Sequence, residues 1–326
     1  MMPAGKNRPF VALIAQPNED ISGLADAYDE IWLDYFNIPE TMKLYPEIAK
    51  YNALTVCAIT GGIPAIMREY APKMSGADNL TAMLAPGSDF VRQMPRLLSR
   101  YFRRPENYHR ILHAIANDNH SVSEIGKFTG FTYNKCDNYL AGLITCGMVK
   151  MHKVNSKHGA EKSAYTLTNN YFKLWYKYVF GKQTEIQLGN AELVQSITKH
   201  IVTQEIHAFH LQQALKHANK HLRGKLWVSF EISEKLVHTP QTVGEITFDG
   251  IVRNGDKAVF VKVFEDPDEN CGKAQLEQIR DAVSKITAYY DSHVFVYTKR
   301  RFSDYAVAEA ANDGSLQLVE LERLWG

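Results

Sequence analysis

The stretch SVSEIGKFTGFTYNKCDNYLAGLITCGMVKM, residues 121–151, carries the local signals that decide the fold around it. Ser121 and Glu124 have the spacing of a capping box, in which each side chain accepts a hydrogen bond from the other residue's backbone amide. Thr129-Gly130 closes that short helix, and the next helix gathers its apolar residues on one face. Gly147 is a typical stop for the second helix. The stretch therefore predicts two helices joined by a tight turn.

The segments on either side complete a recognisable order. Pro105 and Asn107 open an earlier helix, YHRILHAIAN, with its apolar residues along one face. Two β-like runs follow at 148–154 and 163–168, joined by a polar loop. An aromatic-rich segment at 171–182 is expected to be a helix that anchors the hairpin. Helix, helix, turn, helix and hairpin is the order of a winged helix-turn-helix.

The first hundred residues are less regular. RPFVALIAQP, residues 8–17, has a short apolar run closed by proline, which suits a buried strand. Mixed helical spacing then leads to Gly61-Gly62, where one helix should break, and Pro64 can occupy the first turn of the next helix. One or two strands and a helical bundle are therefore expected over residues 1–98.

Residues 183–326 alternate between helical and strand-like patterns. A long helical stretch covers roughly 191–222, and the strands and helices after it indicate a mixed α/β sheet. Strands at 244–253 and 257–264, joined by a Gly-Asp turn, form a hairpin with Asp249 in its first strand. The chain is thus expected to be an α+β multidomain protein. Its predicted domains are residues 1–98, 99–182 and 183–326.

Composition narrows the class of protein. A chain of 326 residues is long for one domain, and 45% hydrophobic with 22% charged residues is ordinary for a globular protein. The four cysteines are scattered without metal spacing, which predicts reduced thiols of a cytosolic protein. The N-terminus has no signal-peptide pattern, and no apolar run approaches membrane-spanning length. The expected location is cytoplasmic, with no membrane partner.

The order of segments resembles the predominantly archaeal AAA-type ATPases that carry a C-terminal winged helix and a restriction-endonuclease-like domain. This resemblance implies that residues 1–98 are a strand and helical lid left from an ATPase core. It also implies that 183–326 is a restriction-endonuclease-like domain. The family begins with a phosphate-binding loop, Gly-x-x-x-x-Gly-Lys-Ser/Thr, which does not occur here, so neither ATP hydrolysis nor a cofactor is expected. The matching stretches are YNALTVCAITGGIPAIM (51–67), residues 103–151, YTLTNNYFKLWYKYVF (165–180) and the hairpin FDGIVRNGDKAVFVKVF (248–264).

The resemblance also bears on nuclease chemistry. Such nucleases need two or three acidic ligands for Mg²⁺ and a lysine beside the scissile phosphate. The resemblance aligns Asp249 with the first ligand and puts Lys262-Val263-Phe264 where Glu-x-Lys is expected. A shifted register puts Lys262 in the lysine position, but then Phe260 replaces the glutamate. Either way the second carboxylate is missing, which implies an inactive, degenerate nuclease domain with no metal.

Two further positions belong to this implied site. The usual upstream helical glutamate corresponds to His210, with Glu205 about a turn away. Lys262 is expected to pair with Asp249 or Glu245 across the hairpin, where a cation would otherwise sit. The degenerate positions are His210, Asp249, Lys262 and Phe264. An acidic run after the strand can be read either as displaced metal ligands or as a solvated loop; its members are Glu265, Asp266, Asp268 and Glu269.

Basic residues concentrate between 101 and 182, where twelve Lys or Arg accompany five Asp or Glu in a chain of net charge +1. This local excess marks the expected phosphate-facing surface. Thr132 and the helix amides suit a phosphate, whereas the amides of Asn134 and Asn138 suit base edges. The candidate DNA-binding residues are Thr132, Tyr133, Asn134, Lys135, Asn138, Lys153, Lys157 and Lys162.

Alternatives stay open at this point. Winged helices also serve as protein-interaction modules, and the predicted recognition helix holds one cation with Asp137 beside it. Histidines at 207, 210, 217 and 221 have spacings that can hold Zn²⁺, but packed or exposed histidines are favoured because no Cys or carboxylate matches them. The leading hypothesis is a non-catalytic protein that docks on DNA or on a protein partner. Its rivals are an active Mg²⁺-dependent DNase and an interaction scaffold without DNA binding.

Overall fold

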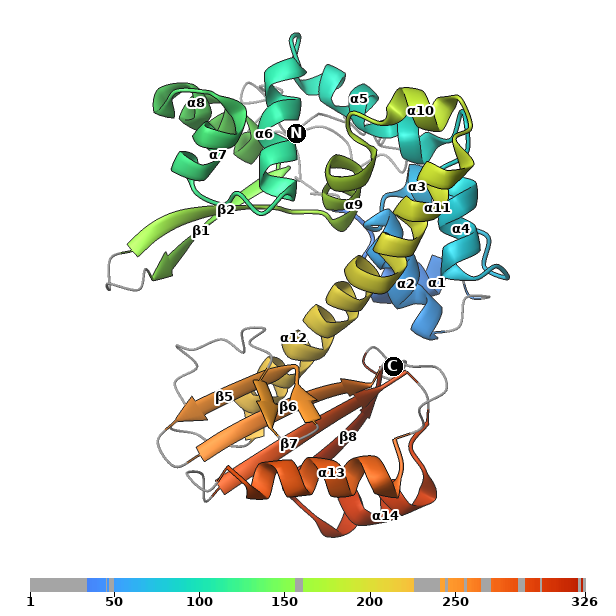
Figure 1. The fold of residues 1–326 in the computed structure, drawn as a ribbon, viewed down its shortest axis with the longest axis vertical. Coiled ribbons are helices and arrows are strands. Elements are labelled where there is room, and N and C mark those ends of the chain that lie inside the picture. The colour runs from blue at the N-terminus through green and yellow to red at the C-terminus, as the bar shows by residue number, and fades with distance from the viewer. Residues whose placement is uncertain are drawn as a thin grey trace, which may run out of the picture. The chain divides into compact units, whose positions relative to one another are not determined.

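The computed structural model describes residues 34–44, 46, 50–155, 161–225, 241–243, 246–254, 257–264, 271–286, 291–299, 301–321 and 324. Helices and small sheets both occur among them, so the protein is of mixed α and β structure (Figure 1). Asp34 and the described residues of 92–180 belong to one compact unit, which we call the continuous unit because 92–180 is a single run of chain. Those of 35–91 and 181–326 belong to a second, the discontinuous unit. The predicted division at residues 98 and 182 stays a prediction.

The continuous unit contains the stretch quoted first. Ser121 and Glu124 form the expected capping box, and Gly130 ends the helix in the left-handed region with φ of 71°. Gly147, also with φ of 71°, follows the next helix. The predicted order of helices and strands is therefore confirmed. Its elements are α6 (Glu106–Ala116), α7 (Val122–Thr129), α8 (Tyr133–Thr145), and the antiparallel pair β1 (Val149–Asn155) and β2 (Glu161–Leu167).

Aromatic side chains hold this unit together. Tyr108 of α6 stacks on Phe102 after α5 (Asp89–Tyr101), with ring centroids 3.5 Å apart. It also lies so close to Gly142 of α8 that an added Cβ would stand 3.2 Å from its ring. The aromatic segment predicted as a helix is confirmed as α9 (Asn170–Leu174), which continues as the π-helical η2 (Trp175–Val179). There the Tyr176 carbonyl lies 2.8 Å from Nδ1 of His113 on α6, so η2 is fastened to α6.

The discontinuous unit begins with four short helices, and a glycine pair divides them. Gly61 and Gly62 have φ of 61° and 72°, and Pro64 stands at the first turn of the next helix, as predicted. The Phe36 amide donates to the Gly62 carbonyl at 2.9 Å. A Cβ on Gly62 would lie 1.9 Å from the Phe36 carbonyl oxygen, so only glycine fits. The helices are α1 (Ile38–Leu44), α2 (Lys50–Thr60), α3 (Pro64–Met67) and α4 (Gly76–Met83).

The buried amide of Asn79 shapes the turn before α4. Its nitrogen donates to the carbonyls of Ala71, Met74 and Ser75, and its oxygen accepts from the Ala71 amide at 2.7 Å. Since every polar atom of this side chain is bonded, its burial costs little. Nothing in the sequence pattern distinguishes this asparagine from a surface one.

The second chain segment of this unit opens with helices. α10 (Gln183–Gln187) precedes a long helical stretch made of α11 (Ala191–His200), the π-helical η3 (Ile201–Ile206) and α12 (His207–Lys225). This confirms the long helix expected from the sequence. The hydroxyls of Thr198 on α11 and Thr81 on α4 are 3.4 Å apart, a contact between the two chain segments. In the described part of the chain, no helix has both the length and the apolar composition to cross a bilayer.

The sheet is mixed, as predicted. β5 (Gly250–Asn254) pairs antiparallel with β6 (Lys257–Phe264), which runs parallel to β7 (Asp291–Thr298), and β7 runs parallel to β8 (Leu316–Glu320). Phe260 and Phe264 belong to the same hydrophobic core as buried residues of α13 (Lys273–Ser284) and α14 (Asp304–Asn312). Figure 1 shows these two helices beside the sheet. Val263 pairs with Tyr297, whose hydroxyl lies 3.0 Å from Nδ1 of His217 on α12. One side of β6 therefore packs against α13, and the other side lies toward α12.

The prediction of a single strand over residues 244–253 is wrong in one respect. It is interrupted at Asp249, with β4 (Ile246–Phe248) before the break and β5 after it. β4 pairs with β3 (Gln241–Val243), whereas β5 pairs with β6. Asp249 therefore lies in a bend between two pairings and not within a strand. The strand expected within residues 8–17 lies outside the described residues.

All four cysteines are buried, and none forms a disulfide. Burial raises the pKa of Cys57 and of Cys146 to about 11. Their thiols are therefore protonated at neutral pH and act as packing groups, because the thiolate is the reactive form of cysteine.

Candidate functional sites

The first candidate surface is the outward side of α8. Cys136, Leu140 and Leu143 of this helix are buried, so the opposite side faces solvent. Thr132 precedes the helix with extended backbone, and its hydroxyl makes no capping hydrogen bond. The other predicted residues are exposed as well, with Tyr133 66% exposed. The exposed predicted residues of this surface are Thr132, Tyr133, Asn134, Lys135 and Asn138.

The hairpin supplies the second part of the predicted surface. Lys153 on β1 and Lys162 on β2 are both exposed. Lys153 lies opposite Ser163 in the register, and its Nζ is 3.5 Å from the serine hydroxyl. Lys157 lies outside the described residues. Lys162 pairs with Val154, one residue along from the Lys153–Ser163 pair, so the side chains of Lys153 and Lys162 point to opposite faces of the hairpin.

Sequence reasoning did not assign a role to Arg110, which lies beside the turn between α7 and α8. Its guanidinium donates to the Thr129 carbonyl at the end of α7 and lies 4.3 Å from the Phe131 ring centroid. Lys135 stands 4.0 Å from the same centroid. The ring therefore holds two cations near the start of α8. The signal is invisible in the sequence because Arg110 comes from a different helix, α6.

The second candidate is the cluster around Asp249. Its Oδ2 accepts from the Val263 amide at 2.8 Å and lies 3.6 Å from Nζ of Lys262. The two side chains are only 13% and 17% exposed. Lys262 Nζ also lies 5.2 Å from the ring centroid of Phe264. The ion pair expected between Lys262 and Asp249 is confirmed, and Glu245 lies outside the described residues.

This arrangement leaves Asp249 already neutralised. The ammonium of Lys262 takes a cation's place beside the carboxylate, and the Phe264 ring offers no oxygen ligand. Among the described residues, no three His, Cys, Asp or Glu side chains gather where they could hold a metal ion. The acidic run at Glu265, Asp266, Asp268 and Glu269 lies outside the described residues.

The helical position aligned with a ligand is more deeply buried than the hairpin. His210 on α12 is fully buried, and Glu205 in η3 is 4% exposed. His217 bonds with Tyr297, so it serves packing between helix and sheet. The side chain of His221 lies outside the described residues. Glu205 is thus a buried carboxylate about one helical turn from the buried His210.

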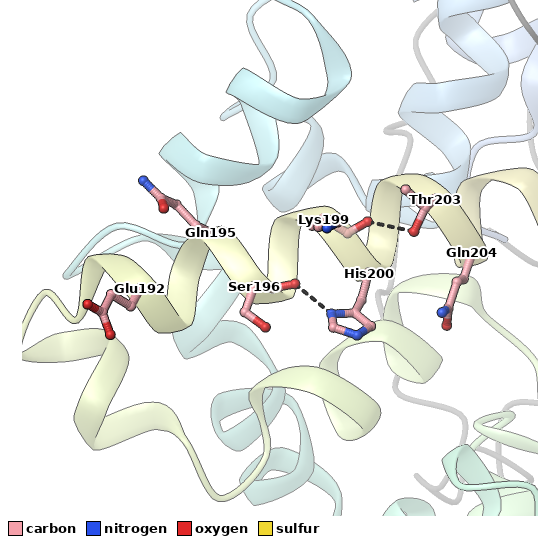
Figure 2. A pocket seen from close by; sticks show the side chains of 7 residues that line it. All are labelled: Glu192, Gln195, Ser196, Lys199, His200, Thr203 and Gln204. Atoms are coloured by element: carbon pink, nitrogen blue, oxygen red, sulfur yellow. Dashed lines mark hydrogen bonds between the residues drawn. The ribbon is translucent and has the colours of Figure 1, made fainter.

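A surface hollow of about 470 Å³ runs along α11 and η3 (Figure 2). Every side chain that lines it comes from this one helical stretch. Its polar groups are partly used within the helix, since His200 Nδ1 lies 2.8 Å from the Ser196 carbonyl and Thr203 donates to the Lys199 carbonyl at 2.9 Å. Because no polar group of a second described element converges on the hollow, it does not have the arrangement of side chains expected of a binding site. Its lining residues are Glu192, Gln195, Ser196, Lys199, His200, Thr203 and Gln204.

No protein-family model matches the sequence. The uncharacterized protein MJECL04 of Methanocaldococcus jannaschii is 24% identical over 149 residues, which are 45% of this chain and 34% of that protein. The match thus spans about a third of that curated relative.

Solved structures are only distantly similar. Protein VC1899 from Vibrio cholerae is 11% identical with a TM-score of 0.21, over 76% of this chain and 58% of that one. The O-methyltransferase NcsB1 from neocarzinostatin biosynthesis, in complex with S-adenosyl-L-homocysteine, is 15% identical with a TM-score of 0.16, over 65% and 63% of the two chains. Likenesses this weak assign neither a fold nor an activity.

Proposed function

We propose that residues 99–182 are a winged helix-turn-helix that binds duplex DNA, and that the protein acts by docking on DNA without cutting it. The observation that carries this proposal is that the polar side of α8 and the lysines of the hairpin that follows it in the chain are all exposed. In winged helix-turn-helix proteins a helix so placed enters the major groove while flanking cations contact phosphates. Arg110, Lys135, Lys153 and Lys162 supply such cations here.

We further propose that the chain derives from the AAA-type ATPases with a C-terminal winged helix, and that 183–326 is a restriction-endonuclease-like domain that has lost its chemistry. Support comes from the Lys262–Asp249 pair, because an ammonium 3.6 Å from the carboxylate repels a divalent cation. A protein partner, such as a separate ATPase, would then supply any catalysis.

Binding should weaken steeply as salt rises. The full chain, titrated into a fluorescent duplex of roughly 20 base pairs, should lose affinity between about 50 mM and about 200 mM salt, because phosphate contacts release counterions. Replacing Lys135, Lys153 and Lys162 together by alanine should weaken binding roughly tenfold to thirtyfold and make the salt slope shallower by about 3. Fluorescence anisotropy measures both quantities.

Lys199→Ala provides the matched control, since Lys199 is an exposed lysine on α11, outside the proposed surface. That variant should bind DNA as the unaltered protein does. If the triple variant bound DNA as tightly as the unaltered protein, or if binding did not depend on salt, the winged helix would not be the DNA-binding surface.

A second candidate function is docking on protein alone. Large apolar side chains of the same segment are exposed, and they favour a protein partner over phosphates. Salt-independent capture of a partner, with no duplex bound at about 50 mM salt, would support this candidate. The exposed side chains are Phe128, Tyr133, Ile144 and Met151.

No DNA cleavage is expected. Purified protein incubated with supercoiled plasmid and Mg²⁺ or Mn²⁺ should leave the plasmid intact on an agarose gel, because Lys262 and Phe264 stand where acidic ligands are needed. The control is Asp249→Asn, prepared in parallel. Nicking by the unaltered protein that disappears in Asp249→Asn would establish an active site at Asp249.

A further inference from the structure

The centre of the exposed side of α8 has a distinctive chemistry. Residues 134, 138, 141 and 145 recur at the spacing that brings side chains to one side of a helix. All of them are exposed, opposite the buried Cys136, Leu140 and Leu143. The stripe reads Asn, Asn, Ala and Thr, without a charged residue. We propose, resting on the proposed DNA binding, that this stripe reads adenine in the major groove, so that the protein prefers A·T-rich duplexes.

The two asparagine amides are the reading groups. An asparagine side chain offers a donor and an acceptor in one plane, which matches N6 and N7 of adenine. Within the described residues, no hydrogen bond engages the amide of Asn134 or Asn138. By contrast, the structural asparagines of the same unit, Asn107, Asn117 and Asn119, all donate to neighbouring groups. The stripe amides are thus exposed and available to a ligand.

The rest of the stripe fits thymine, the partner base. Thr145 donates its hydroxyl to the Ala141 carbonyl at 3.0 Å, which occupies the polar group. Its methyl group and that of Ala141 then suit contact with the thymine methyl. Guanine is best read by arginine or lysine, and the stripe has neither. Lys135 lies on the flank of the helix, with its ammonium over Phe131.

Two duplexes of roughly 20 base pairs, one alternating A·T and one alternating G·C, test this preference with the full chain. We expect roughly tenfold tighter binding to the A·T duplex. An A·T duplex built with 7-deazaadenine lacks the N7 acceptor and should bind no better than the G·C duplex. The variant Asn134→Ala/Asn138→Ala should bind all three duplexes with the same affinity.

The outcomes separate the two proposals. Binding that depends on salt but shows no A·T preference would overturn adenine reading and leave DNA binding intact. A preference that survives both 7-deazaadenine and the double asparagine variant would also overturn it, because the preference would then come from the minor groove. Absence of binding to every duplex would overturn the proposed function itself. Lys153→Ala is the companion variant and should weaken binding to both unmodified duplexes by the same factor.

Discussion

Gly62→Ala should lower the free energy of unfolding of the discontinuous unit by about 3–4 kcal/mol. The φ of 72° disfavours any residue with a Cβ, which costs about 1–2 kcal/mol. The added Cβ would also lie 1.9 Å from the Phe36 carbonyl oxygen. Because Phe36 donates to the Gly62 carbonyl at 2.9 Å, the two backbones cannot separate without losing that hydrogen bond.

Urea unfolding followed by circular dichroism measures this loss, and Gly189→Ala isolates its cause. Gly189 belongs to the same unit and has φ of 77°, but its Cβ would meet nothing within 4 Å. That control should cost only about 1 kcal/mol. If both variants lost the same free energy of unfolding, the close approach of Phe36 would contribute nothing to the effect of Gly62→Ala.

Lys262→Glu should convert the Asp249 ion pair into a site that needs a metal ion. In the unaltered protein the ammonium lies 3.6 Å from Oδ2 of Asp249, and both side chains are mostly buried. A second carboxylate in this place would repel the first and destabilise the metal-free unit by roughly 3 kcal/mol. Mn²⁺ should then restore about 2–3 kcal/mol once its concentration exceeds Kd by roughly a hundredfold. The unaltered protein should show no such response.

Thermal unfolding with and without Mn²⁺ measures the effect, and Lys262→Gln is the neutral control. Glutamine also removes the ammonium but adds no charge, so this variant should be destabilised without any gain from Mn²⁺. A gain in the unaltered protein or in Lys262→Gln would mean that the ion binds elsewhere. No gain in Lys262→Glu would show that Asp249 and residue 262 cannot share a metal ion.

Prediction from sequence succeeded where the signal is local. The capping box at Ser121 and Glu124, the glycines that end helices, and the Gly61-Gly62 break each act within a few residues of the chain. Amphipathic spacing likewise indicated which side of α8 is exposed. The pairing expected for Lys262 across the hairpin was also right for Asp249, whose carboxylate lies 3.6 Å from the ammonium.

Prediction failed where partners come from distant parts of the chain. The bend at Asp249 arises because β4 pairs with β3 and β5 pairs with β6, and a strand-like sequence does not reveal where pairing changes. Arg110 reaches Phe131 from another helix. The environment of Asn79 likewise depends on a folded turn. Such contacts are properties of the tertiary structure, which overrides local propensity.

The way the chain enters and leaves the discontinuous unit has a consequence during synthesis. Residues 35–91 leave the ribosome before 181–326, with residues 92–180 of the continuous unit between them. The first segment must therefore wait for α11 before Thr81 can meet Thr198, whereas the other unit draws only on residues that precede 181. Domains form as their residues emerge, so this unit can be completed first, while the apolar sides of α2 and α4 need protection from aggregation.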